Sequence, residues 1–219
     1  MPSSTPVGAI FFDVDGTLVP NTSSSAYLAG FMGHQEEVNR VERDYANGIL
    51  TNQQVSAVDA AGWAGQTHSN VMRWLTGLPL VDGISDVVEW SKQRRLEPIL
   101  ATLAWEPVGK YLASRFGFHS YCGSQLEIVD GAYTGNVIGS FDEYDKLNFA
   151  IRQAELLGFP IGHCAAIGDS RSDLPLFEAV GLSVAFNASE GVRRKASATA
   201  TGPDIRAVIP SLASHFART

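Results

Sequence analysis

The sequence predicts an α/β protein with a doubly wound, mostly parallel sheet and a small helical insertion. Two observations carry this prediction. From Val81 onward, short apolar segments alternate with amphipathic helical segments. Between the first apolar segment, residues 7–12, and that alternating region, residues 21–81 show helical patterns and no convincing strand.

The first apolar segment is continuous and ends in Asp and Gly, which is typical of a buried strand that turns at its carboxyl end. Glycines interrupt the helical patterns of residues 21–81, as expected of several short helices. We therefore predict an α/β core made of residues 1–20 and 82–219, which would carry the catalytic residues. Residues 21–81 would form a helical cap.

The elements expected in the second part of the core alternate in type. They are a helix over 85–95, a strand over 97–101, a helix from Pro107 to Gly117, a hairpin over 126–138 turning at Asp130-Gly131, a helix over 143–157, a strand over 163–167, a helix over 173–180 and a last strand over 182–186. Such alternation is typical of a Rossmann-like parallel sheet, in which ligands bind beyond the carboxyl ends of the strands.

Composition excludes several classes of function. The 219 residues carry a formal charge of −7, which argues against a nucleic-acid partner. No apolar run approaches the ~20 residues of a membrane helix, and the N-terminus lacks the regions of a signal peptide. Cys122 and Cys164 lack metal-ligand spacing, so we expect reduced thiols in a cytoplasmic protein without a membrane partner. No pattern predicts the oligomeric state.

Two carboxylates follow the first strand. Asp13 and Asp15 are two residues apart, and Gly16 permits the sharp turn that must follow. Hydrolysis of a phosphate monoester needs a nucleophile, an acid for the leaving oxygen and cations that offset phosphoryl charge. The first carboxylate could face phosphorus while the second reaches the leaving oxygen. The alternative is a loop in which one Asp caps a turn.

Two further polar residues are expected on the same edge of the sheet. Thr102 ends the second strand, where its hydroxyl and nearby backbone N–H groups, such as those of Leu103 and Gly16, could hold phosphoryl oxygens. Lys146 lies in the first turn of a helix, where a cation is slightly unfavourable unless it offsets anions. Taken alone, an ordinary strand-end threonine and a surface lysine remain the simpler interpretations.

A fourth element, Gly168-Asp169-Ser170-Arg171-Ser172-Asp173, follows a buried strand. Asp169 could ligate magnesium, which prefers hard oxygen ligands, and Asp173 could orient Asp169 or a metal-bound water. The alternative is a helix cap by Ser172 or Asp173. All four elements fall on one predicted edge, which makes coincidence improbable.

These four elements resemble the motifs of the haloacid dehalogenase superfamily. Asp13-Val14-Asp15-Gly16-Thr17 is similar to its first motif, Thr102 to its second, Lys146 to its third, and Gly168-Asp169 with Asp173 to its fourth. A short helical cap between motifs one and two, and a hairpin before motif three, resemble the phosphoserine phosphatase-like branch.

The resemblance implies a role for each residue. Asp13 would be the nucleophile, and Asp15 the general acid and later the base. Thr102 and Lys146 would hold the phosphoryl group. A magnesium ion would be bound by Asp13, by Asp15 through its backbone carbonyl, and by Asp169 with support from Asp173. The implied activity is a magnesium-dependent phosphatase that forms an aspartyl-phosphate on a small phosphorylated metabolite.

Two departures from that branch bear on the substrate. Phosphoserine phosphatases carry a cap glutamate for the substrate ammonium, but the matching position here is about Thr22. They also carry a cap arginine for the carboxylate, and the stretch from Val55 to Asp59 has none. We therefore expect phosphoserine to be a poor substrate. Two alternatives stay open: a phosphomutase or phosphotransferase of the same superfamily, and a phospho-accepting receiver-type signalling domain.

Overall fold

The computed structural model describes residues 5–139 and 141–217, so the first four residues of the expected core segment 1–20 lie outside it. Its main sheet has six strands in the order β3-β2-β1-β6-β7-β8, and every neighbouring pair is parallel. The strands are β1 (Gly8–Phe12), β2 (Leu96–Leu100), β3 (Ser120–Tyr121), β6 (Ala165–Gly168), β7 (Leu182–Phe186) and β8 (Ala198–Ala200). This confirms the predicted fold class.

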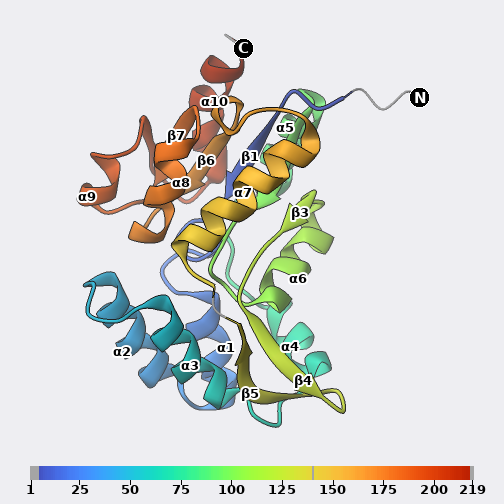
Figure 1. Ribbon diagram of the computed structural model, residues 1–219, viewed down its shortest axis with the longest axis vertical. Coiled ribbons are helices and arrows are strands. Elements are labelled where there is room, and N and C mark those ends of the chain that lie inside the picture. The colour runs from blue at the N-terminus through green and yellow to red at the C-terminus, as the bar shows by residue number, and fades with distance from the viewer. Residues whose placement is uncertain (1–4, 140, 218–219) are drawn as a thin grey trace.

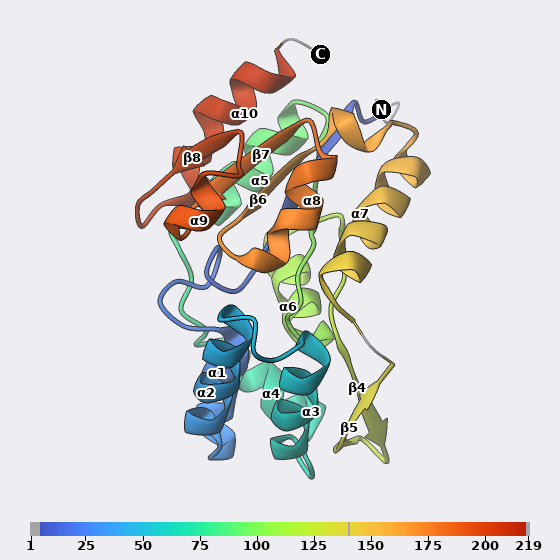
Figure 2. The same ribbon diagram turned by 60° about the vertical axis from the view of Figure 1, so that its left-hand side comes forward.

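Alternate residues of the central strands face two separate apolar clusters, as the period of two in a strand requires. Ile10 and Phe12 of β1 pack with one set of helices, and Ala9 and Phe11 pack with another. The first set comprises α5 (Ile84–Gln93), α6 (Glu106–Phe116) and α10 (Ile209–Phe216), and the second α7 (Glu143–Leu157), α8 (Leu174–Ala179) and α9 (Glu190–Arg193). Helices therefore cover both faces of the sheet (Figure 2).

Two short strands escaped prediction. β3 and β8 contain two and three residues, too few to show an alternating pattern, so the strand over 182–186 is not the last. The segment expected as strand from residue 163 begins as the short 3-10 turn Ile161–His163. Two other 3-10 turns are Arg171–Asp173 and Ile205–Val208.

The expected cap is helical. It contains α1 (Ser24–Met32), α2 (Gln35–Ala46), α3 (Asn52–Gly62) and α4 (His68–Leu75), which lie together below the carboxyl edge of the sheet (Figure 1). The hairpin of β4 (Gln125–Val129) and β5 (Ala132–Ile138) forms a sheet of its own beside these helices. Its Tyr133 N–H donates to the Gln66 carbonyl at 2.8 Å.

A buried carboxylate joins the cap to the core. Asp59 of α3 is 1% exposed, and its Oδ2 accepts a hydrogen bond of 2.6 Å from the indole of Trp105, which precedes α6. Its Oδ1 accepts from the Trp63 indole at 3.2 Å and lies 2.8 Å from His34 Nε2. Because a buried charge must be paired, this cluster fixes the position of the cap against the core.

Both cysteines are buried and free. No helix within the described residues is long and apolar enough to cross a bilayer.

We predict that Trp105→Phe lowers the free energy of unfolding by about 1.5–3 kcal/mol, because it removes a hydrogen bond to a buried charge. Urea unfolding measures this change. Trp74→Phe is the matched control, since none of the hydrogen bonds among the described residues uses its indole N–H. Equal losses in the two variants would contradict a structural role for the bond to Asp59.

Candidate active site

The first motif forms a tight loop directly after β1. The Asp13 N–H donates to the Ile167 carbonyl of β6 at 2.9 Å, which continues the sheet by one residue. Val14 and Leu18 are both fully buried, and the Leu18 N–H donates to the Val14 carbonyl at 2.7 Å. Apolar anchors therefore fix the loop, and the 5% exposed side chain of Asp13 stands at the edge of the sheet.

Gly16 is required at its position for two reasons. Its φ of +83° lies in the left-handed region. A Cβ atom there would also stand 2.3 Å from Asp169 Oδ2. The glycine thus provides the turn that the sequence predicted, and it admits the carboxylate of the fourth motif. Thr17 of the same loop donates its hydroxyl to Asp169 Oδ1 at 3.2 Å.

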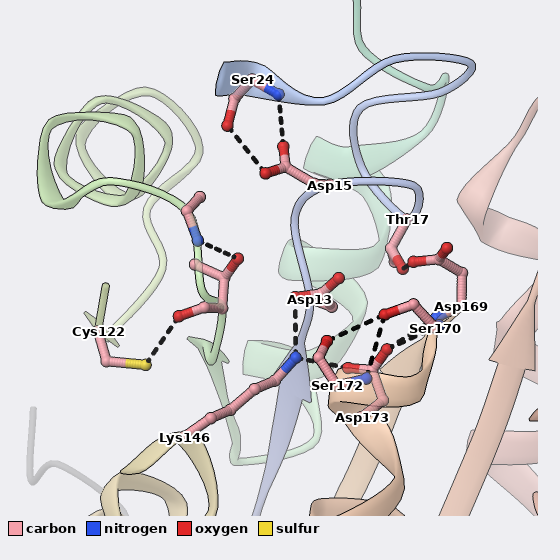
Figure 3. Close-up of polar contacts among 12 residues, drawn as sticks. Asp13, Asp15, Thr17, Ser24, Cys122, Lys146, Asp169, Ser170, Ser172 and Asp173 are labelled. Atoms are coloured by element: carbon pink, nitrogen blue, oxygen red, sulfur yellow. Dashed lines mark hydrogen bonds and ion pairs between the residues drawn. The ribbon is translucent and has the colours of Figure 1, made fainter. Parts of the chain in front are cut away.

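Lys146 lies inside the site and not on the surface. Asp142 caps α7 by accepting from the N–H groups of Tyr144 and Asp145, so the start of the helix is fixed. Lys146 Nζ, with no solvent exposure, donates to Asp13 Oδ1 at 2.8 Å and to Asp173 Oδ1 at 2.5 Å (Figure 3). Burial alone would lower the pKa of Lys146, but these two carboxylates outweigh it and raise the pKa.

Asp173 organises the fourth motif from within. Its Oδ2 accepts the N–H groups of Asp169 and Ser170, each at 3.0 Å. A Cβ on Gly168 would come within 2.1 Å of Asp173 Cγ, so only glycine admits this carboxylate beneath the loop. Asp173 occupies the expected N-cap position of α8, but its side chain makes no cap hydrogen bond to that helix. Ser170 caps the preceding 3-10 turn, where its hydroxyl accepts the Ser172 N–H at 3.4 Å.

Three carboxylates converge on one small volume. Asp13, Asp169 and Asp173 each offer an oxygen within 4.8 Å of the others. Among the described residues, Lys146 alone forms ion pairs with members of this group, namely Asp13 and Asp173. Burial, reinforced by the neighbouring carboxylates, raises the pKa of Asp13 to about 7 and that of Asp169 to about 8. A set of oxygen donors with excess negative charge fits a hard divalent cation such as Mg²⁺.

The side chain of Asp15 lies outside this group. Its Oδ1 accepts the Ser24 N–H at 2.6 Å, and its Oδ2 accepts the Ser24 hydroxyl at 3.1 Å. Figure 3 shows the carboxyl directed to Ser24 and away from Asp13. Burial raises the pKa of Asp15 even though both hydrogen bonds from Ser24 lower it. A raised pKa suits a carboxyl group that must donate a proton.

A cavity of about 860 Å³ lies between the core and the cap. Asp13, Asp15, Thr102 and Leu103 line its core side. The Thr102 hydroxyl oxygen accepts the Ala104 N–H at 3.1 Å, which leaves its own O–H available as a donor. Within the described residues the Leu103 N–H takes part in no backbone hydrogen bond. These two donors can meet the oxygens of an anion.

Sequence reasoning missed the part that α2 plays in lining the cavity, above all Asn39 and Glu42. Asn39, Glu42 and Tyr45 follow one another at three-residue spacing on α2, and all three face the cavity. Glu42 Oε1 accepts the Ser23 hydroxyl at 2.6 Å. A glutamate therefore does stand next to the position of Thr22, although it comes from another helix. The three-residue spacing of these polar residues was the sequence signal that could have identified this face of the helix.

Comparison with known proteins agrees with this geometry. The sequence pattern of the haloacid dehalogenase-like hydrolases matches residues 10–178, a range that contains all four motifs. The chain belongs to this family.

The curated relatives of the chain in this family include phosphatases. A phosphoserine phosphatase of Streptomyces coelicolor is 29% identical over 91% of this chain and 49% of its own length. One of Albidiferax ferrireducens is 26% identical over 86% of this chain and 82% of its own length. The chain thus spans about half the length of the first relative and most of the second.

A solved structure, a phospho-aspartyl intermediate analogue of phosphoserine phosphatase, superposes with a TM-score of 0.85 at 22% identity. The superposition covers 95% of this chain and 99% of the chain in the solved structure. These matches confirm the predicted resemblance to phosphoserine phosphatase-like phosphatases of the family, and the solved structure confirms the fold.

We predict that metal-free protein becomes less stable as pH rises from about 4 to about 8. Asp13 and Asp169 have raised pKa values in the folded state, so the folded protein binds more protons than the unfolded chain in this range, and its free energy of unfolding falls. Saturating Mg²⁺ should oppose this loss, most strongly at the high end. Thermal unfolding with and without Mg²⁺ provides the measurement. A Mg²⁺ effect that did not grow with pH would refute the interpretation.

Proposed function

We propose that the protein is a Mg²⁺-dependent phosphatase that hydrolyses a small phosphorylated metabolite in the cytoplasm through an aspartyl-phosphate on Asp13. One observation supports this most: a buried ammonium, Lys146, fixes one oxygen of Asp13 at the wall of a cavity that Asp15 also lines. Nucleophile and acid are thereby present on the same side of one site.

Asp13 is suited to attack phosphorus. Its Oδ1 accepts from Lys146, while its Oδ2 accepts no hydrogen bond from the described residues. Attack by this free oxygen would form the bond to phosphorus as the bond to the leaving oxygen breaks. Lys146 holds the carboxylate in place and offsets the charge of the phosphoryl oxygens, which the Thr102 hydroxyl and the Leu103 N–H would bind.

Asp15 supplies and then removes a proton. In the first step its carboxyl group would protonate the leaving alcohol, so that a neutral product departs. In the second step the resulting carboxylate would take a proton from the water that attacks phosphorus, which frees Asp13 and regenerates the acid. Ser24, which binds both oxygens of Asp15, ties this group to the first helix of the cap.

The residues that would hold Mg²⁺ are Asp13, Asp169 and the backbone carbonyl of Asp15. Asp173 would support Asp169, because its own oxygens already accept from Lys146 and from two backbone N–H groups. Bound Mg²⁺ would offset the negative charge of the phosphoryl group next to two carboxylates.

Two alternatives to hydrolysis follow from the sequence. A receiver-type domain is disfavoured, because the matched family consists of hydrolases and the match extends through the cap. A phosphomutase or phosphotransferase would use the same nucleophile and differs only in the acceptor. Release of inorganic phosphate into water distinguishes it from the proposed hydrolase.

We predict that Asp13→Asn abolishes phosphate release, because an amide cannot form the acyl phosphate. Asp15→Asn should lower kcat by about 10²–10⁴, the usual contribution of a general acid. Phosphate release from a panel of phosphorylated metabolites in Mg²⁺ measures both. Asp86→Asn, at an exposed position on α5, is the control for loss of one carboxylate. Near-wild-type turnover by folded Asp13→Asn protein would rule out the mechanism.

Removal of metal should stop turnover, and Mg²⁺ should restore it. Asp169→Asn should raise the Mg²⁺ concentration for half-maximal rate by at least about tenfold, because it removes a charged ligand. A titration of rate against free Mg²⁺ tests this. Undiminished turnover in excess chelator would exclude the proposed metal dependence.

A further inference from the structure

The cap side of the cavity is acidic. Among the described residues of 21–81 that line it, two carry carboxylates, Glu42 and Asp59, and none is a lysine, arginine or histidine. The basic side chains at the cavity, Arg171 and Lys195, come from the core. A leaving group that reaches Glu42 and Asp59 therefore meets negative charge.

The two cap carboxylates differ in their partners. Asp59 is satisfied by Trp105, Trp63 and His34, as described above. Glu42 accepts only from the hydroxyl of Ser23, and it belongs to none of the ion pairs formed by described residues. Glu42 is thus a fixed, partly buried carboxylate that has no cation.

Its position is set by the start of the cap. The Ser23 hydroxyl that donates to Glu42 also accepts the Ala26 N–H at 2.8 Å as the cap of α1. The next residue, Ser24, binds Asp15. Burial raises the pKa of Glu42 to about 7, and the charges of Asp15 and Asp59 add to this. Glu42 therefore stands close to the group that would protonate the leaving oxygen.

A second feature of the same helix calls for a ligand. The Tyr45 hydroxyl oxygen is buried and has no hydrogen-bond partner in the part of the chain that the structure describes, although Tyr45 lines the cavity. It follows Glu42 by three residues, so the two lie on the same face of α2. A donor that enters between α2 and the core can satisfy the Tyr45 hydroxyl, whose ring has the guanidinium carbon of Arg171 4.3 Å from its centre. Trp105 also lines the cavity, and its indole donates to the other cap carboxylate, Asp59.

We propose that Glu42 binds an ammonium group on the leaving alcohol, and that the preferred substrates are phosphate monoesters of amino alcohols that carry no carboxylate. This inference rests on the proposed function, because it places the leaving group beside Asp15. A substrate carboxylate would enter next to Glu42 and Asp59 without a cap cation. Arg171 is already engaged by the Tyr45 carbonyl at 2.9 Å and by Glu143 at 3.4 Å.

The test varies amine and carboxylate separately on small esters. Four substrates are compared by kcat/KM in Mg²⁺: 2-aminoethyl phosphate, 2-hydroxyethyl phosphate, phosphoserine and phosphoglycolate. The wild-type protein should prefer 2-aminoethyl over 2-hydroxyethyl phosphate by about tenfold or more, the usual contribution of a hydrogen bond to a charged group. Glu42→Gln should reduce that ratio to near one.

Glu36→Gln is the matched control, since Glu36 lies on the exposed side of the same helix. It should retain the wild-type ratio. A wild-type ratio near one, a ratio insensitive to Glu42→Gln, or a preference for phosphoserine or phosphoglycolate would each overturn the proposal. The last outcome would assign the carboxylate to Arg171.

Binding separates this inference from the proposed function. Asp13→Asn protein is titrated calorimetrically with 2-aminoethyl and 2-hydroxyethyl phosphate in Mg²⁺. Tighter binding of the amine, lost in Asp13→Asn/Glu42→Gln protein, supports the ammonium site at Glu42 even if wild-type protein releases no phosphate from any ester of the panel, an outcome that would defeat the proposed function alone. Equal affinities would overturn the inference whatever the turnover.

Discussion

The fully buried ammonium of Lys146 holds the carboxylates of Asp13 and Asp173 together at the carboxyl edge of the sheet. A buried charge without partners is costly, and removing one partner of such a pair costs about 3–5 kcal/mol. The three side chains therefore constrain one another. They come from the loop after β1, from α7 and from the 3-10 turn that follows β6, so the ion cluster also fixes how these segments meet.

The charge balance of the cluster accounts for the chemistry proposed at it. One ammonium cannot neutralise Asp13, Asp169 and Asp173, and burial together with the neighbouring carboxylates raises the pKa values of Asp13 and Asp169. A divalent cation would correct it, and an incoming phosphoryl group would then find positive charge in a site built of carboxylates. The same imbalance recurs in the cap, where Glu42 has no basic partner among the described residues.

The fold and the catalytic half of the site follow from local patterns. Buried strands of four or five residues, each ended by Asp, Thr or Gly-Asp, are visible in the sequence, and a parallel sheet brings their carboxyl ends together. Lys146 could be placed because it lies in the first turn of a periodic helix. The role of Gly168 could not, because it depends on a carboxylate five residues later that folds back beneath the loop.

The cap side of the site could not be predicted either, because it also depends on contacts between segments that are distant in the sequence. Glu42 stands beside Ser23 only because α1 and α2 pack antiparallel to each other, a tertiary relationship that no spacing encodes. The sequence around Thr22 therefore gives no indication of this glutamate. Asp59 entered the sequence analysis only as the end of a stretch without arginine, and only the fold showed that it accepts from the Trp105 indole of the core.

The central claim is that Asp13 carries the phosphoryl group, and trapping that species tests it most directly. Protein mixed with a radiolabelled phosphate ester and Mg²⁺ is quenched in acid during turnover, digested and mapped by mass spectrometry. The account predicts a hydroxylamine-sensitive label in the peptide that contains Asp13. Turnover without label in that peptide, or with label on another residue, would contradict it.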